Sequence, residues 1–200
     1  SKIDLDELGL KYIGSLFYVE NSFRGLVKVV NNSRKFFAEN SRAQRMPVAL
    51  KDSTMFTLCG PENYGKGLKV PVYVMQRVFD EYSQTEMLIS LYHENDHCEV
   101  FHNGFIVDEK TVDPMIISPR THSDLLELRA ESLQLEMTDY VQKKIPSMSS
   151  EISKSYTREN EKRYASIVDR LKLKKDDNLL DPLAQDLIVS YLEKYGNIKV

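Results

Sequence analysis

The densest group of reactive side chains is the run His93-Glu94-Asn95-Asp96-His97, with His102 following it. The spacing His-Glu-x-x-His matches the zinc-hydrolase signature, in which two histidines bind the metal from one face of a helix and the glutamate is the general base. This chemistry requires a helix at these positions. Whether the segment is helix or strand therefore decides whether the pattern has catalytic meaning.

The residues around this pattern favour strands. Asn95-Asp96 and Asn103-Gly104 separate β-branched and aromatic runs between Met87 and Lys110, and Asn-Gly is typical of a two-residue hairpin turn. We therefore predict a three-stranded antiparallel meander over about 87–110, with one face buried. In this register His93 and His97 point to opposite faces of the sheet, so we do not expect them to share a metal ion.

A weaker metal hypothesis uses the other face of the same meander. His93 and Cys98 are cross-strand neighbours in this register, and His102 lies further along the same face. Such groups beside an apolar face are more often packed or hydrogen-bonded than metallated. We therefore predict no metal and no cofactor. No arrangement of serine, cysteine or paired carboxylates stands out, so we assign no catalytic or cofactor-binding residue.

A glycine-rich stretch suggests a nucleotide-binding loop. Gly60 to Lys66 fits the spacing Gly-x-x-x-x-Gly-Lys, but Gly67 stands where the magnesium-binding hydroxyl is needed. Pro71 and the β-branched residues after it also make a poor phosphate-binding helix. We interpret the stretch as a turn, and keep a metal- or nucleotide-dependent enzyme as a second alternative function.

Two basic patches suggest contact with phosphates. Because acidic residues also lie along the second patch, it is more typical of a solvated helix face. A nucleic-acid-associated factor that uses patches 34–45 and 154–175 is the first alternative function. The candidate residues are Arg34, Lys35, Arg42, Arg45, Lys154, Arg158, Lys162 and Arg163.

Composition indicates an ordinary globular protein. The 200 residues are 42% hydrophobic and 28% charged, with a net charge of −3, which provides no overall attraction to nucleic acid or membrane. No apolar run approaches the ~20 residues of a membrane span. With only two cysteines, we expect a soluble protein of a reducing, cytoplasmic compartment or of an assembled particle. Ser1 would fit a complete small protein after removal of its initiator Met, with chain ends packed against a partner.

The pattern along the chain predicts an α+β fold. We expect a domain over 1–118 with an N-terminal helix to about Tyr18, an antiparallel sheet, and a short helix over 72–82. Residues 16–30 fit a helix or a hairpin equally well. Strands are expected at 48–51, 53–59 and 115–117. Three helices are expected over 119–200, beginning near Thr121, near Ser149 and at Asp181, and packing on the first domain or on a partner.

These features favour a function in protein interaction. The catalytic motifs have faults, and the second long helix carries only a thin apolar stripe, which indicates one contact face. The leading hypothesis is a non-enzymatic structural subunit or adaptor of a larger assembly, such as a virion, or a homo-oligomer, without membrane association. The candidate interface residues are Tyr156, Tyr164, Leu187 and Tyr191.

Overall fold

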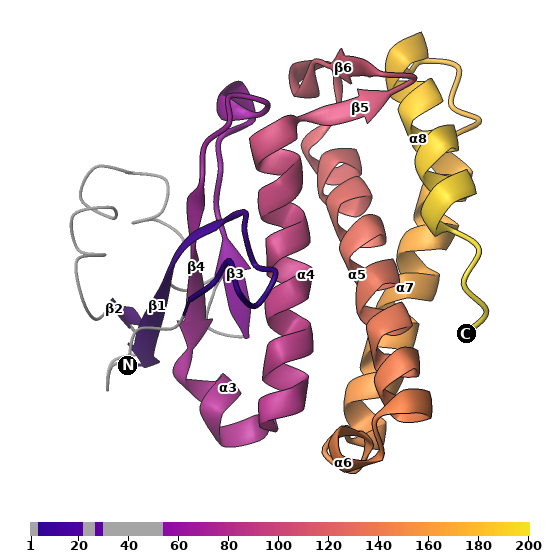
Figure 1. Ribbon diagram of the computed structural model, residues 1–200. Helices are drawn as coiled ribbons and strands as arrows, with labels where there is room; N and C mark the ends of the chain where they lie inside the picture. The colour runs from indigo at the N-terminus through magenta and orange to yellow at the C-terminus, as the bar shows by residue number, and fades with distance from the viewer. Residues whose placement is uncertain (1–3, 22–26, 30–53) are drawn as a thin grey trace.

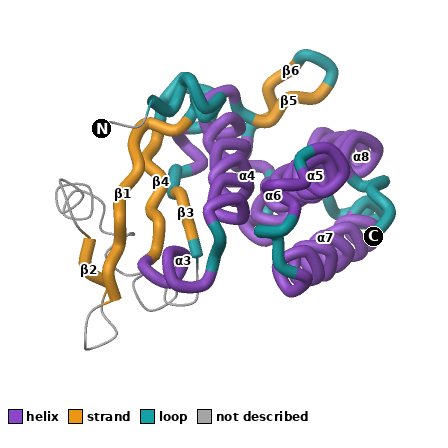
Figure 2. Tube along the Cα trace, turned by 60° about the horizontal axis from the view of Figure 1, so that its bottom comes forward, coloured by secondary structure: helices purple, strands orange, loops and turns teal. Residues whose placement is uncertain are grey.

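A long central helix separates a β-sheet from a group of helices. The structure, a computed structural model, describes residues 4–21, 27–29 and 54–200. In Figures 1 and 2 the central helix, α4 (Gln84–Asn103), has the sheet on one side and the C-terminal helices on the other. The predicted α+β class is confirmed.

The sheet combines parallel and antiparallel pairs in the strand order β2-β1-β4-β3. The two middle strands, β1 and β4, run parallel, and each pairs antiparallel with an outer strand. A two-stranded antiparallel sheet, β5-β6, follows α4. The strands are β1 (Ile13–Asn21), β2 (Val27–Val29), β3 (Met55–Thr57), β4 (Val70–Met75), β5 (Phe105–Val107) and β6 (Lys110–Val112).

Helices make up most of the remaining described chain. A short helix leads from the sheet into α4, and the C-terminal helices follow the β5-β6 hairpin. The other helices are α3 (Gln76–Glu81), α5 (Pro119–Lys144), α6 (Pro146–Ser149), α7 (Lys154–Lys174) and α8 (Pro182–Tyr195). Two short 3-10 helices cover η1 (Pro61–Asn63) and η2 (Pro114–Ile116).

The meander predicted over 87–110 is wrong, because most of that segment is α4. A capping box starts the helix: the Ser83 hydroxyl accepts from the Glu86 amide, and the Glu86 carboxylate accepts from the Ser83 amide. The helix ends at Gly104, whose φ of 82° is accessible to glycine. The hairpin turn lies further on, at Asp108 and Glu109, both with positive φ.

Several other predictions are corrected in the same way. Residues 13–21 form strand β1 instead of an N-terminal helix, and the predicted helix over 72–82 is divided between β4 and α3. The expected strand at 115–117 is largely the 3-10 helix η2. Within 16–30, the antiparallel pairing of β1 with β2 agrees with the hairpin alternative. β3 confirms a strand within 53–59, whereas the strand at 48–51 lies outside the described residues.

The three long C-terminal helices are confirmed, with the single turn α6 added between the first two. The cap of α8 is the predicted Asp181, whereas α5 and α7 begin at other caps than those predicted near Thr121 and Ser149. The side chains of Ser118, Ser153 and Asp181 accept hydrogen bonds from amides in the first turns of α5, α7 and α8. Pro119 and Pro182 occupy first-turn positions, where a missing amide hydrogen costs nothing.

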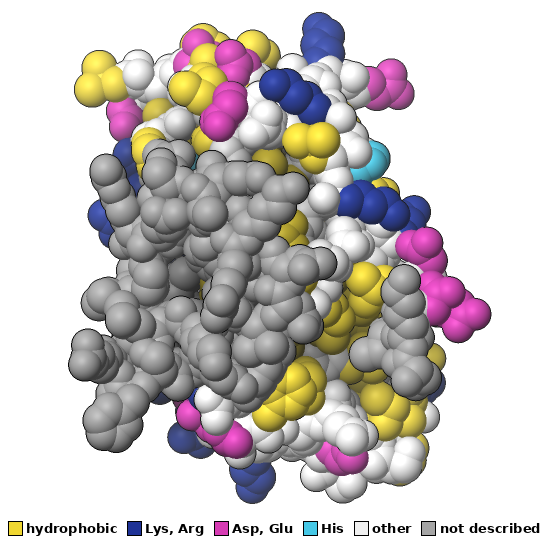
Figure 3. Space-filling view, turned by 90° about the vertical axis from the view of Figure 1, so that its left-hand side faces the viewer, with side chains coloured by type: hydrophobic (Ala, Val, Ile, Leu, Met, Phe, Trp, Pro, Cys, Tyr) yellow, Lys and Arg dark blue, Asp and Glu magenta, His cyan; other side chains and the backbone are white. Residues whose placement is uncertain are grey.

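The two larger apolar cores of the described residues lie on the two sides of α4. One is formed by the inner face of the sheet with α4, and includes Leu10, Val72, Val74 and Cys98. The other joins the end of α4 and the β5-β6 hairpin to α5, α7 and α8. On the sheet side of the molecule, hydrophobic side chains are visible beside charged ones (Figure 3). None of the described helices combines the length and apolar character needed to cross a bilayer.

The second core provides a test of helix docking. Leu187 of α8 is fully buried in it, whereas Leu183, one turn earlier, is 51% exposed. Leu187→Ala is expected to lower the free energy of unfolding by about 2–5 kcal/mol, because it removes buried methyl groups and leaves a cavity. Leu183→Ala is expected to change it by less than about 1 kcal/mol. Urea denaturation of both variants checks this, and equal losses would contradict the packing described.

Candidate metal centre

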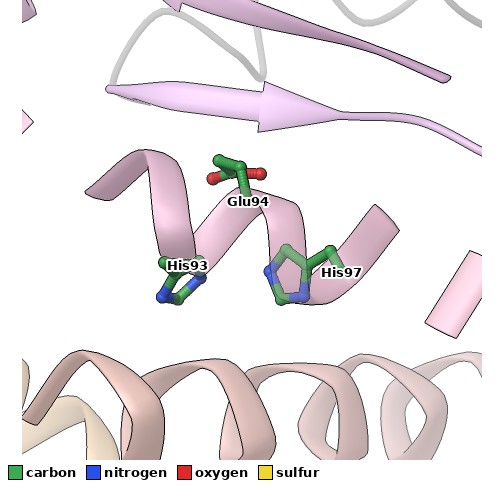
Figure 4. Close-up of side chains that lie close together, drawn as sticks. All are labelled: His93, Glu94 and His97. Carbon is green, nitrogen blue, oxygen red and sulfur yellow. The ribbon is translucent and has the colours of Figure 1, made fainter. Parts of the chain in front are cut away.

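Helix α4 brings His93, Glu94 and His97 together at its middle. The two histidines are one turn apart, so their side chains share a face and point towards α5, whereas Glu94 points towards the strands (Figure 4). All three residues are buried. Oxygen and ring-nitrogen atoms of the three side chains lie within 4.8 Å of one another.

Helix α5 supplies a carboxylate that both histidines share. Oε2 of Glu127 lies 3.2 Å from Nε2 of His93, and Oε1 lies 3.2 Å from Nε2 of His97. One carboxylate therefore faces the same ring nitrogen of two imidazoles. The Glu127 side chain is 38% exposed, more than either histidine, so this cluster is reached from solvent on its Glu127 side.

These three side chains have the composition of a catalytic zinc site, which takes three His or carboxylate ligands and leaves one position for water. Ligand atoms about 2.0–2.2 Å from a tetrahedral zinc ion are roughly 3.3 Å apart. The two nitrogen–oxygen distances of 3.2 Å agree with that separation. Each distance involves a different oxygen of Glu127, so a zinc ion held by His93, His97 and one Glu127 oxygen would require these side chains to move. The sets whose ligand atoms already lie within 4.8 Å of one another are His93 with Glu94 and His97, and His93 with Glu127 and Glu131.

The electrostatics of the metal-free cluster come from the shared carboxylate. Burial on its own would lower the pKa of His93, but the adjacent Glu127 outweighs burial and raises that pKa to about 10. Burial likewise opposes ionisation of Glu127, but His97 and His93 hold its pKa well below the usual value. Without metal, Glu127 is therefore a carboxylate paired with a protonated His93, and a metal ion would replace that proton.

Two further carboxylates lie next to the three ligands. Burial raises the pKa of Glu94, an effect that His97 and His93 partly offset, so this group holds a proton more readily than an exposed glutamate. Glu131, one turn after Glu127 on α5, accepts from Nε of Arg163 at 2.8 Å. Its other oxygen, Oε2, is buried without a hydrogen-bond partner among the residues that the structure describes.

A cavity of about 320 Å³ adjoins the cluster. Its walls come from five elements around the site: β3 with the residue before it, the α3 region, α4, α5 and α7. The metal-site side contributes His93, Glu94 and Glu127, and the opposite side is polar. The remaining lining residues are Thr54, Met55, Arg77, Tyr82, Ser90, Glu131, Gln134, Glu159 and Arg163. The cavity provides space for a small ligand or an extended chain segment beside Glu94 and Glu127.

The structure separates the metal candidates His93, Cys98 and His102. Successive helical residues are rotated by about 100°, so Cys98 lies roughly 140° from His93 and His97 only about 40°. Cys98 is fully buried against the sheet, with its sulfur 3.7 Å from the Thr57 hydroxyl. His102 packs edge-on against Tyr12 near the end of α4. The strand register that placed His93 and His97 on opposite faces is wrong, because the segment is helical and both residues lie on one face.

Glu127 and Glu131 were not among the site residues predicted from the sequence. Both lie on the helix that was correctly predicted after Thr121, and their four-residue spacing places them on one face of α5. The spacing alone does not show which neighbour that face meets. Two glutamates one turn apart downstream of a His-Glu-x-x-His pattern are the signal that was available.

The other predicted site residues lie away from this cluster, with one exception. Lys154, Arg158 and Lys162 are exposed on α7, whereas Arg163 is paired with Glu131 beside the cavity. The first patch, which comprises Arg34, Lys35, Arg42 and Arg45, lies outside the described residues. Nucleic-acid binding by either patch stays a prediction.

The four interface candidates are buried within this chain. Tyr164, Leu187 and Tyr191 belong to the core between α5, α7 and α8, and Tyr156 packs between α4 and α5. A partner would have to displace a helix to reach them. The predicted interaction through these side chains stays untested.

The glycine-rich stretch from Gly60 to Gly67 packs on the end of α4. The amides of Gly65 and Gly67 donate to the carbonyls of Phe101 and His102, each at 3.0 Å. The stretch then leads into strand β4. A phosphate-binding loop instead directs its amides at the ligand and opens a helix. This geometry therefore gives no support to a nucleotide site.

No family model, curated protein or solved structure matches this chain.

The His93–Glu127 pair predicts a pH dependence for the metal-free protein. The pKa of His93 is raised in the folded state, so its contribution to stability is complete below about 6.5, the unfolded value, and is lost as the pH rises through about 10. Between these values we expect the free energy of unfolding to fall by up to about 1.4 kcal/mol per pH unit, relative to His93→Gln. Urea denaturation with a chelator, from pH 6.5 to 9.5, measures this difference. Parallel pH profiles for the two proteins would contradict the pairing.

Proposed function

We propose that this protein is a zinc-dependent hydrolase, with His93, His97 and Glu127 as metal ligands and Glu94 as general base. The observation that carries the proposal is the shared Glu127 carboxylate, 3.2 Å from Nε2 of each histidine. A His2Glu donor set with an open fourth position is typical of catalytic zinc.

The metal ion and Glu94 would have separate roles in the reaction. A zinc ion in this position would polarise a substrate carbonyl and lower the pKa of a bound water molecule. Glu94 would take the proton of the attacking water and pass it to the leaving group. Its raised pKa suits both transfers, because a general acid–base group works best when its pKa approaches the working pH.

A peptide is the substrate class that the surroundings favour. Among the described strands β3 lies at the edge of the sheet, and Thr54 and Met55 at its start line the cavity. An edge strand offers unpaired backbone groups to which an extended peptide can hydrogen-bond. A peptide held along β3 would bring a carbonyl to the same cavity as Glu94 and Glu127.

This proposal departs from two expectations of the sequence analysis, a non-enzymatic role and the absence of a cofactor. The interaction subunit is kept as a second candidate, because three leucines around the turn from α7 to α8 are exposed. Leu173, Leu179 and Leu183 are 81%, 94% and 51% exposed. Light scattering would give a defined oligomer or complex for an assembly subunit, and a monomer at all protein concentrations would contradict that role.

Zinc binding and hydrolysis are tested together with three variants. The wild type is expected to bind one zinc ion and to cleave members of a mixed fluorogenic peptide set. His97→Gln removes a ligand, so zinc affinity is expected to fall by more than about 100-fold, beyond the effect of losing a supporting residue. Glu94→Gln retains the ligands and should keep the zinc, while kcat falls by about 100-fold or more. Calorimetric zinc titration and peptide cleavage measure the two effects.

His102→Gln is the matched control, since His102 lies on the same helix but away from the cluster. It is expected to bind zinc and cleave peptides like the wild type. A wild-type protein that binds no zinc at micromolar concentration would refute the proposal. Zinc binding that survives His97→Gln would refute the ligand assignment, and full activity in Glu94→Gln would refute the general base.

A further inference from the structure

A chain of buried hydrogen bonds leads from the metal cluster to α7. Nδ1 of His93, the ring nitrogen that does not face Glu127, lies 2.7 Å from Oε1 of Gln134 on α5. Nε2 of Gln134 then donates to the Tyr156 hydroxyl of α7, also at 2.7 Å. Gln134 and Tyr156 are 3% and 5% exposed, so water does not compete for these bonds.

The Tyr156 hydroxyl determines which group donates and which accepts in each of these hydrogen bonds. It donates its only hydrogen to the backbone carbonyl of Glu86 at 3.2 Å, and a carbonyl can only accept. With that hydrogen used, the hydroxyl accepts from Gln134 and from the Ser90 hydroxyl at 3.0 Å. The amide nitrogen of Gln134 must therefore face Tyr156, which leaves its oxygen to accept a hydrogen from Nδ1 of His93.

We propose that Gln134, oriented by Tyr156, is a positioning residue that holds His93 with its hydrogen on Nδ1 and its Nε2 directed at the metal. The inference rests on the proposed zinc site and deepens it. A neutral imidazole carries one hydrogen, and the partner of one ring nitrogen decides which nitrogen is left to bind metal. His97 differs, because its Nδ1 is buried without a hydrogen-bond partner in the described part of the chain.

Hydrogen bonds between the first residues of α4 and α7 hold Tyr156 in place. Oε2 of Glu86 accepts from the Ser153 amide at 3.1 Å and from its hydroxyl at 2.8 Å. Oε1 of the same carboxylate accepts from the Ser83 amide at 2.9 Å. One side chain thus joins the first residues of α4 and α7, and Tyr156 follows one turn into α7. The orientation of His93 consequently depends on how α7 docks against α4.

The test compares zinc affinity and histidine tautomer in four variants. Gln134→Leu removes the acceptor, so zinc affinity is expected to fall about 10–100-fold. Tyr156→Phe leaves Gln134 free to turn, and a smaller loss of several-fold is expected. Gln134→Glu keeps an acceptor for His93 but loses the donor to Tyr156, so it is expected to retain more zinc affinity than Gln134→Leu. Competition with a chromophoric zinc chelator measures the affinities.

Tyr164→Phe is the matched control, since this buried tyrosine lies on the same helix and its hydroxyl donates to the carbonyl of Tyr195, away from His93. It is expected to bind zinc like the wild type. Nitrogen-15 NMR of the imidazoles in the zinc-loaded proteins, where a coordinated His93 is neutral, reports the tautomer directly. His93 is expected to carry its hydrogen on Nδ1 in the wild type and in Tyr164→Phe, and to lose this preference in Gln134→Leu.

The outcomes separate the two proposals. Wild-type affinity in Gln134→Leu, in a protein that does bind zinc, would overturn the positioning role and leave the zinc site standing. Failure of the wild type to bind zinc would overturn the site itself. Circular dichroism and urea denaturation confirm that each variant is folded. An equal loss of affinity in Tyr164→Phe and Tyr156→Phe would show that only general packing is involved, and would also overturn the positioning role.

Discussion

The sharing of one carboxylate by two buried imidazoles is the interaction on which the centre of this molecule depends. Glu127 fixes the rotation of α5 about its own axis, since its two oxygens must meet Nε2 of both His93 and His97. Arg129 of α5 likewise pairs with two side chains of α4. Its guanidinium nitrogens lie 3.0 Å from Asp96 and 2.5 Å from Glu99. The interface between α4 and α5 is therefore matched in charge as well as shape.

Joining two helices through buried charged groups carries a large desolvation cost. Taking charges out of water costs several kcal/mol per ion, and apolar packing of the same volume often gives equal or greater stability. What the paired charges provide is a specific register, because a shift of α5 by one turn would place Leu125 or Leu133 where Arg129 contacts Asp96 and Glu99. A site that needs ligands from two helices requires that register. This requirement gives a physical reason for polar residues at positions that an ordinary helix pair would fill with leucine.

The sequence predicted the helical C-terminal half well and the central helix poorly, for one physical reason. Helix α8 begins at the predicted cap Asp181, and α5 and α7 begin within a few residues of the predicted starts, at Ser118 and Ser153. Helix α4 is enclosed by the sheet on one side and by α5 on the other (Figure 2). Burial on both sides removes the periodic contrast between apolar and polar residues that marks an amphipathic helix. Its β-branched residues and Asn103-Gly104 then favoured strands, although Ser83 and Glu86 formed a capping box.

The candidate site was predictable only in part. The pattern from His93 to His97 named three of its residues, and their chemistry followed once helix replaced strand. Glu127 and Gln134 could not be assigned, because their roles arise from which side of α5 meets α4. The same limit applies to Tyr156, which a thin apolar stripe marked as a contact residue. Its hydroxyl, bonded to two other helices, matters as much as its ring.

The carboxylate of Glu86 has a consequence for the order in which the protein folds. Its contact with Ser153 spans 67 residues, and closing so long a loop must precede any gain from the contact. Helix pairs that are close in sequence, such as α5 with α7, have shorter loops to close. The site between α4, α5 and α7 is therefore complete only after α7 has docked on α4. A metal ion that recognises only this docked arrangement adds stability by mass action, and so favours this docking step over its reversal.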